Sequence, residues 1–244
     1  MWSCHRRQAY PYPRRVAILP RILRPTAPPC EQAILVGDPG RALLLAQQLL
    51  VAPAPMFNHH RGLWGYSGPT ASGNGDLLIQ GTGMGGPSLA AVVTDLIELG
   101  VKSFVRVGTA AAATSSCPAP GGILIARDAV ASDGTSRSLT AGVHVVAADP
   151  GLVASAVADL SDSAALGRVL SCDLPQTPPS WADEHASDAI DMSTAALYAL
   201  CESEGIPAVS LLVITGGETN PLAENDLNEA VCVAGSTATR LLQP

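Results

Sequence analysis

The sequence predicts a single α/β domain in which helices cover both faces of a mixed, largely parallel β-sheet. Short apolar runs typical of buried strands alternate along the chain with amphipathic helical patterns. With 244 residues and a hydrophobic fraction of 47%, the chain can form one sizeable core. The sequence shows no internal repeat and no clear domain boundary beyond an N-terminal extension.

The extension is an Arg- and Pro-rich stretch of residues 1–30, and the α/β domain is predicted for residues 31–244. No acidic residue occurs before Glu31. The composition is faintly like that of an organellar transit peptide, but serine is scarce and no amphipathic helix is clear. A disordered or strapping extension is the favoured interpretation, and an early start-codon assignment would also produce such a stretch.

The first predicted strand is Ala33–Val36, followed by the turn Gly37-Asp38-Pro39-Gly40-Arg41 and a helix from Arg41 to Leu50. A glycine turn between a strand and a helix can bind an anion, because free backbone N–H groups point out of the helix start. The adjacent Arg41 would strengthen such a site. An ordinary βα loop with a solvated arginine is the alternative that this spacing leaves open.

The next segment, Met56–Gly68, is predicted to begin as a loop and to continue as a strand from Leu63 to Tyr66. After a turn, a strand at Leu77–Gln80 is expected to pair with it in antiparallel fashion. The adjacent side chains of His59 and His60 would point in opposite directions on an extended chain, so this pair does not predict a metal site.

The most informative stretch runs from Gly81 to Thr109 and reads GTGMGGPSLAAVVTDLIELGVKSFVRVGT. Its first six positions hold four glycines, which tolerate positive φ and a close approach of the backbone. Pro87 suits the first turn of a helix, and Gly100 would end that helix. A second strand follows at Ser103–Val107. This β-loop-α-β unit presents bare backbone N–H groups at a helix start, where anions bind.

Arg106 lies near the end of an apolar strand, where a lone charge would be costly to bury. Two interpretations stay open. Arg106 either forms a structural ion pair with an acid elsewhere, or it clamps a phosphate, since the guanidinium fork matches phosphate bidentately.

The glycine stretch also matches the dinucleotide pattern G-x-G-x-x-G at Gly81, Gly83 and Gly86. A Rossmann site would need an acidic residue at the end of the second strand to hold the ribose hydroxyls. That region carries Arg106 and Thr109 and no Asp or Glu. NAD binding is therefore not favoured.

The remaining chain continues the alternation of strands and helices. In chain order we expect a small-residue loop at Ala110–Pro120, a strand at Gly122–Ala126, a helix capped by Asp149-Pro150 that runs through Leu160, a strand at Val169–Cys172, a loop at Pro175–Ser187, a helix at Ser193–Glu204, a strand at Ala208–Ile214 and a helix at Ala223–Leu242.

Composition limits the partners and cofactors. The net charge of −7 argues against a nucleic-acid binder, and no run is long and uncharged enough to span a membrane. The six cysteines are far apart and form no C-x-x-C pair, so no zinc site or disulfide framework is expected. No metal and no organic cofactor is predicted, and a cytoplasmic location is expected.

Together these residues resemble the hexameric nucleoside phosphorylases, the family of uridine phosphorylase and bacterial purine nucleoside phosphorylase. The similarity runs from about Ala33 to Leu242 and is strongest over Gly81–Thr109, where TGMGGPS and FVRVGT look most like the uridine branch. Further motifs are GDPGR at Gly37–Arg41, HHRG at His59–Gly62 and IDMSTAALYALCESEG at Ile190–Gly205. The resemblance implies an α/β domain with a distorted, barrel-like sheet.

The resemblance also implies an activity. In that family, phosphate attacks the anomeric carbon of a nucleoside and releases the base and ribose 1-phosphate. The implied phosphate site uses the backbone N–H of Gly37, the catalytic guanidinium groups of Arg41 and Arg106, and the hydroxyl of Thr109. Arg61 would be donated by a neighbouring subunit, so a homo-oligomer of dimers, up to a hexamer, is expected, with inorganic phosphate as co-substrate.

The implied ribose and base pocket departs from the family pattern. Met84 and Met192 match the family's methionines near the ribose. Where the family has Glu-Met-Glu, this chain has Asp191-Met192-Ser193, and a serine can make only a weaker, neutral bond to ribose. The base-protonating aspartate of the purine branch would fall near Gly216. The uridine branch's base-binding arginine is absent from 175–187, which carries Gln176, and His5 has the wrong spacing to serve a neighbour's ribose.

Three functions are compatible with this pattern. The first is an active nucleoside phosphorylase of the uridine or purine type with an altered pocket, in which Asp191, His185 or Glu218 replaces a missing group. The second is a catalytically impaired phosphate-binding homologue with an assembly or regulatory role. The third, a nucleoside hydrolase, is favoured least, because a water nucleophile gives no reason to keep three arginines.

Overall fold

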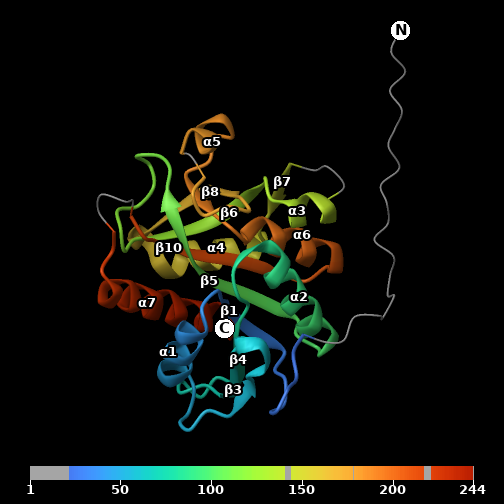
Figure 1. The fold of residues 1–244 in the computed structure, drawn as a ribbon. Coiled ribbons are helices and arrows are strands. Elements are labelled where there is room, and N and C mark those ends of the chain that lie inside the picture. The colour runs from blue at the N-terminus through green and yellow to red at the C-terminus, as the bar shows by residue number, and fades with distance from the viewer. Residues whose placement is uncertain (1–21, 141–143, 178, 217–220, 244) are drawn as a thin grey trace.

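The structure, a computed structural model, describes residues 22–140, 144–177, 179–216 and 221–243 (Figure 1). The described strands are β1 Gln32–Val36, β2 Met56–Asn58, β3 Gly65–Pro69, β4 Asp76–Gly81, β5 Ser103–Ala112, β6 Ile123–Ala131, β7 Val145–Ala147, β8 Ala164–Ser171, β9 Ala189–Asp191 and β10 Ala208–Ile214. The α-helices are α1 Pro39–Leu49, α2 Gly85–Glu98, α3 Gly134–Leu139, α4 Pro150–Leu160, α5 Pro179–Glu184, α6 Thr194–Glu204 and α7 Glu224–Leu242. Two 3₁₀ turns, His60–Gly62 and Ser161–Ser163, complete the set.

The described strands form one mixed sheet that closes partly into a barrel. The order β10-β6-β8-β9-β5 returns to its start because β5 also pairs with β10. From β5 the sheet continues outward through β1, β4, β3 and β2. Strand β5 joins the barrel to the extension because its first half pairs with β1 and its last residues pair with β9. This arrangement confirms the predicted α/β domain with a barrel-like sheet.

Four neighbouring strands, β4, β1, β5 and β10, run parallel in that order. The register places Val36 beside Gly81, and Arg106 between Leu35 and Ser210. Parallel strands end at the same edge of a sheet, and loops at that edge commonly hold ligands. The glycine turn after β1, the glycine loop after β4 and the end of β5 therefore share one edge of the molecule.

Helices cover this sheet with small residues at the closest contacts. Figure 1 shows α7 beside α1 on one side of the sheet and α2 beside α6 on the other. A Cβ added to Gly235 of α7 would lie 2.5 Å from Cδ2 of Leu45 on α1, so a larger residue here would displace that side chain. In α6, the buried Tyr198 hydroxyl donates to the carbonyl of Ala126 at 2.6 Å and accepts from the N–H of Ser210 at 2.9 Å. These contacts lock α6 onto the barrel.

The structure corrects several predictions of individual elements. Met56–Asn58 is a strand and not a loop, and β5 and β6 extend beyond their predicted ends. The elements α3, β7 and β9 were not expected, and α5 lies within the predicted loop. The unexpected elements have three to six residues, which are too few to show a hydrophobic period in the sequence. Such short elements depend on contacts with the rest of the fold for their stability.

The segment from Ile22 to Cys30 crosses α2 and β2. The N–H of Leu23 donates to the Asp95 carboxylate on α2 at 2.8 Å, and the Leu23 side chain is buried in the core. The hydroxyl of Thr26 donates to the carbonyl of Met56 at 2.7 Å. Residues 1–21 lie outside the described residues, so the extension boundary near residue 30 stays a prediction.

Helices α4 and α7 are joined by Asp159, whose carboxylate accepts from Arg240 Nε at 2.6 Å and from the Thr237 hydroxyl at 2.8 Å. The hydrogen bond from Arg240 is the main cause that holds the pKa of Asp159 below its usual value of 3.8. A carboxyl group whose pKa is lower in the folded than in the unfolded protein stabilises the fold at pH values above its unfolded-state pKa. This stabilisation is lost as the pH falls through the folded-state pKa.

We therefore expect Asp159→Asn to lower the melting temperature at pH 6 and to have a diminishing effect as the pH falls towards 3. Thermal melts of both proteins across this range test the prediction. A difference that stayed constant with pH would show that the carboxylate charge does not contribute.

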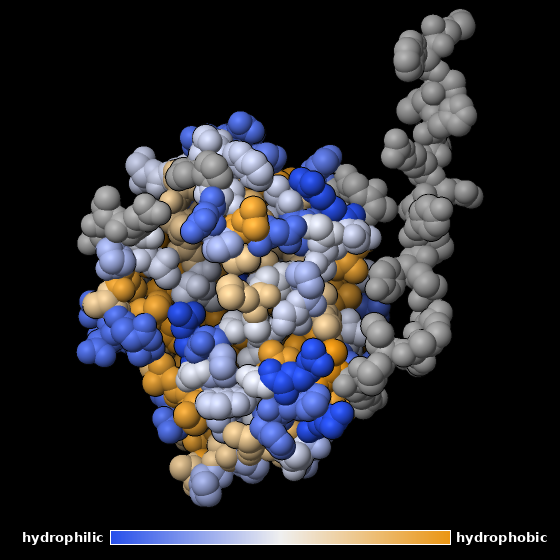
Figure 2. Space-filling view, in the orientation of Figure 1, coloured by the Kyte–Doolittle hydropathy of each residue, from blue (hydrophilic) through white to orange (hydrophobic). Residues whose placement is uncertain are grey.

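The surface shown in Figure 2 carries apolar residues in separate patches among polar ones. Among the described helices, none is long and apolar enough to cross a lipid bilayer.

Candidate functional site

Two glycine turns lie against each other at the shared strand edge. The N–H of Thr82 donates to the carbonyl of Val36 at 2.7 Å, and the Thr82 hydroxyl donates to the same oxygen at 3.1 Å. A Cβ on Gly37 would lie 3.7 Å from the Gly83 carbonyl oxygen. The turn that starts α1 and the loop that starts α2 are therefore held side by side by the backbone.

The loop before α2 can be formed only by glycine at key positions. Gly83 and Gly85 have φ angles of 72° and 81°, which disfavour residues with a side chain. A Cβ on Gly83 would lie 2.5 Å from Ser88 Oγ, and one on Gly86 would lie 2.8 Å from Asp133 Oδ1. Met84 is the N-cap of α2 and makes no side-chain cap hydrogen bond. Free backbone N–H groups at such a helix start are what the predicted anion site requires.

Arg106 is buried on β5 and forms an ion pair with Asp191. Its Nη1 lies 3.0 Å from Asp191 Oδ2 and donates to the Thr194 hydroxyl at 3.2 Å. The exposed fractions of the Arg106 and Asp191 side chains are 7% and 0%. The guanidinium also folds over Gly108, where a Cβ would lie 2.4 Å from Nη1. The ion pair, one of the two interpretations left open by the sequence, is thus present, and it joins β5 to the start of α6.

Asp191 in turn is surrounded by donors. Its Oδ1 accepts from the Ser171 hydroxyl at 2.6 Å, and its Oδ2 accepts from the Thr194 hydroxyl at 2.7 Å. The backbone N–H groups of Ser193 and Thr194 also donate to this carboxylate. A carboxylate at a helix N-terminus is stabilised by the helix dipole and by the free N–H groups. Asp191 therefore both caps α6 and pairs with Arg106.

Of the other predicted phosphate ligands, Arg41 and Thr109 lie on neighbouring elements of the same edge. Arg41 is half-buried in the first turn of α1, where its N–H donates to Asp38 Oδ1 at 3.0 Å. Thr109 is half-buried on β5, opposite Val213 of β10.

Arg61 is exposed and has a φ of 59°, an uncommon value for a residue with a side chain. Buried amides hold its loop. Asn58 Nδ2 donates to the carbonyl of Leu63 at 2.5 Å, and Gln80 Nε2 donates to the same carbonyl at 2.9 Å. Gln80 also donates to the carbonyl of Gly81 at 2.7 Å, which ties the Arg61 loop to the glycine loop.

The predicted ribose residues gather where α2 and α6 begin. Met192 is half-buried, and its Cε lies 4.0 Å from the position of a Cβ on Gly85. Ser193 is buried, whereas the Met84 side chain is 76% exposed. His185 is exposed and its Nδ1 contacts the carbonyl of Trp181 at 2.8 Å. Glu218 lies outside the described residues.

Two residues of this network, Ser171 and Thr194, were not predicted. The N-cap of α6 is Ser193 and Asp191 lies two residues before it, so the usual capping spacing does not indicate Thr194. No local pattern marks Ser171, which meets Asp191 only through the pairing of β8 with β9. Among the described residues, no group of three or more His, Cys, Asp or Glu is arranged to hold a metal ion.

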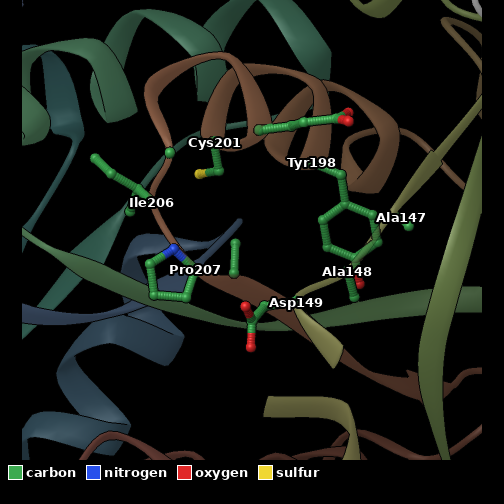
Figure 3. A pocket seen from close by; sticks show the side chains of 10 residues that line it. Ala147, Ala148, Asp149, Tyr198, Cys201, Ile206 and Pro207 are labelled. Atoms are coloured by element: carbon green, nitrogen blue, oxygen red, sulfur yellow. The ribbon is translucent and has the colours of Figure 1, made fainter. Parts of the chain in front are cut away.

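A separate cavity of about 420 Å³ lies at the other end of α6 (Figure 3). Figure 3 shows the sulfur of Cys201 and the ring of Tyr198 beside it, with Asp149 and Pro207 on the opposite wall. Burial raises the pKa of the Cys201 thiol to about 12, so the thiol is protonated and unreactive at neutral pH. This cavity shares no lining residue with the glycine loops.

Comparison with known proteins identifies the family. The family model of the phosphorylase superfamily matches residues 31–243. Purine nucleoside phosphorylase DeoD-type of Alkaliphilus metalliredigens (strain QYMF) is 30% identical over 203 residues, which are 78% of this chain and 85% of the relative. The protein of the same name from Geobacillus kaustophilus (strain HTA426) is 32% identical over 224 residues, which are 86% of this chain and 93% of the relative. The chain therefore belongs to the phosphorylase superfamily, in its nucleoside phosphorylase family.

Proposed function

We propose that this protein is a nucleoside phosphorylase that uses inorganic phosphate to cleave a nucleoside into the free base and a pentose 1-phosphate. The observation that carries the proposal is the buried Arg106 at the strand edge where two glycine turns meet. The names of the relatives favour purine nucleosides as the substrates to test first.

In the proposed reaction, a phosphate oxygen bonds to the anomeric carbon as the bond from that carbon to the base nitrogen breaks. The electron pair leaves with the base, which takes up a proton. The N–H groups near Gly37 and Gly83, the guanidinium groups of Arg41 and Arg106 and the hydroxyl of Thr109 would hold the phosphate beneath the developing positive charge of the sugar.

The remaining roles follow the family resemblance. Met84, Met192 and Ser193 would line the sugar pocket. The exposed position and firmly held loop of Arg61 support a role at a neighbouring subunit, so we propose a homo-oligomer. No organic cofactor is proposed.

One observation favours a second candidate, a phosphate-binding homologue with impaired catalysis. Ser193 offers only a neutral hydroxyl where the family has a glutamate, and the Asp191 carboxylate is already occupied by its neighbours. Loss of one charge-assisted hydrogen bond to the sugar would cost roughly 1.5–3 kcal/mol. That loss corresponds to a roughly ten- to hundred-fold slower reaction, which a sensitive assay would still detect.

The test is a panel of purine and pyrimidine nucleosides incubated with the purified protein, with and without phosphate, and analysed for free base. Release that requires phosphate is the expected result. Release without phosphate would identify a hydrolase. No release, together with a phosphate-induced rise in melting temperature, would identify the impaired homologue.

A further inference from the structure

We propose that Asp191 and Ser171 are positioning residues, which fix the Arg106 guanidinium for phosphate binding, and that Asp191 is not a ligand of the sugar. The inference rests on the proposed function of the site. It changes the role that the family resemblance suggests for Asp191. It also adds Ser171, 20 residues earlier in the chain, to the residues that shape the site.

The first step is the saturation of the Asp191 carboxylate. Its Oδ1 receives the Ser171 hydroxyl and the N–H groups of Ser193 and Thr194, at 2.6, 3.2 and 3.3 Å. Its Oδ2 receives the hydroxyl and the N–H of Thr194, at 2.7 and 3.1 Å, and forms the ion pair with Nη1 of Arg106 at 3.0 Å. An ionised carboxylate has about four lone-pair sites. The four hydrogen-bond donors, together with the Arg106 ion pair, already fill these sites, so no acceptor is left for two sugar hydroxyls.

The second step is the position of Ser171. It is the last residue of β8, it is fully buried, and it lies in register with Asp191 of β9. Its hydroxyl donates to Asp191 and accepts from the N–H of Ala195 in the first turn of α6, at 2.9 Å. Ser171 therefore fixes the carboxylate relative to the barrel and to the helix at the same time. Without this contact, Asp191 Oδ1 would be held only by backbone donors of α6.

The third step is the edge of Arg106 that Asp191 leaves available. Both described contacts of the guanidinium, to Asp191 and to Thr194, use Nη1. One face of the group lies on the backbone of Gly108. The edge formed by Nε and Nη2 is not used by Asp191, and that edge of an arginine fork suits bidentate binding of phosphate. Asp191 would thus set the direction in which this edge points.

The experiment compares Ser171→Ala with Ser210→Ala. Ser210 is a matched control, because its hydroxyl is equally buried, it lies beside Arg106 in the sheet, and it has no hydrogen-bond partner among the described residues. Phosphate affinity is measured from the rise of melting temperature with phosphate concentration. The KM values for phosphate and for the best nucleoside are measured separately. Melting without phosphate reports whether each variant is folded.

We expect Ser171→Ala to weaken phosphate binding and raise the phosphate KM roughly tenfold, as for one lost hydrogen bond to a charged group. The nucleoside KM should change less than twofold, and Ser210→Ala should change neither constant. Ser171→Thr, which keeps the hydroxyl, should restore part of the phosphate affinity. Asp191→Asn, which keeps the shape but weakens the pairing with Arg106, should show the same selective loss.

A raised nucleoside KM with unchanged phosphate affinity in Asp191→Asn would make Asp191 a sugar ligand and overturn the inference. Equal changes in both constants, or no change in either, would also overturn it. A wild-type protein that neither responds to phosphate nor releases base would overturn the proposed function and this inference together. A wild-type protein that binds phosphate without releasing base still tests the inference, through the melting shifts alone.

Discussion

Replacing Arg106 by methionine is expected to abolish the phosphate-induced rise in melting temperature and to lower the free energy of unfolding by about 3–5 kcal/mol. The stability loss follows because the variant leaves the Asp191 carboxylate buried without its cationic partner. The binding loss follows because Arg106 is the buried arginine of the described strand edge, held by its ion pair with Asp191. Denaturant unfolding and thermal melts with added phosphate measure the two effects.

A double variant separates stability from binding. In Arg106→Met with Asp191→Asn, the neutral amide can still accept from the N–H groups of α6, and no unpaired charge remains in the interior. We expect the double variant to recover more than half of the lost free energy of unfolding. Its melting temperature should still not rise when phosphate is added. A phosphate response retained by either variant would contradict the role of Arg106.

Gly108→Ala is expected to weaken phosphate binding at least tenfold without changing the backbone conformation of the strand. Gly108 does not have a positive φ, so alanine fits the strand conformation. The added Cβ would lie 2.4–2.8 Å from three atoms of the Arg106 guanidinium. The strand cannot move easily within the barrel, so the guanidinium has to move and the geometry offered to phosphate is lost.

Gly68→Ala is the matched control for this prediction. Gly68 also lies on a strand, and a Cβ there would meet only Pro55 Cδ at an ordinary 3.6 Å. Calorimetric titration of both variants with inorganic phosphate makes the comparison. Wild-type affinity in Gly108→Ala would show that the guanidinium position is not important for binding.

Much of the fold follows from local patterns in the sequence. The core strands β1, β4 and β10 each contain a short run of buried apolar residues, and such runs identify strands buried on both faces. The helix α4 begins where Asp149 and Pro150 predict. The closure of the barrel could not be predicted from the residues alone, because it depends on the three-residue strand β9 and on the pairing of β5 with two distant strands.

Parts of the candidate site could likewise be predicted from the sequence, and other parts could not. The glycine loop was predictable because the need for positive φ appears directly as glycine in the sequence. The partner of Arg106 was not, because Asp191 lies 85 positions away and only the fold brings them together. No local sequence pattern indicates a role for Ser171. Its role follows from the register of β8 against β9, which cannot be derived from the spacing of residues in the sequence.

Phosphorus NMR of a reaction mixture follows the fate of phosphate and so tests the central claim most directly. With a cleavable nucleoside, inorganic phosphate should be consumed in proportion to the base released, and a sugar phosphomonoester signal should appear in equal amount. Base released beside an unchanged inorganic phosphate signal would contradict the account, because the nucleophile would then not be the anion that the glycine turns and Arg106 are proposed to hold.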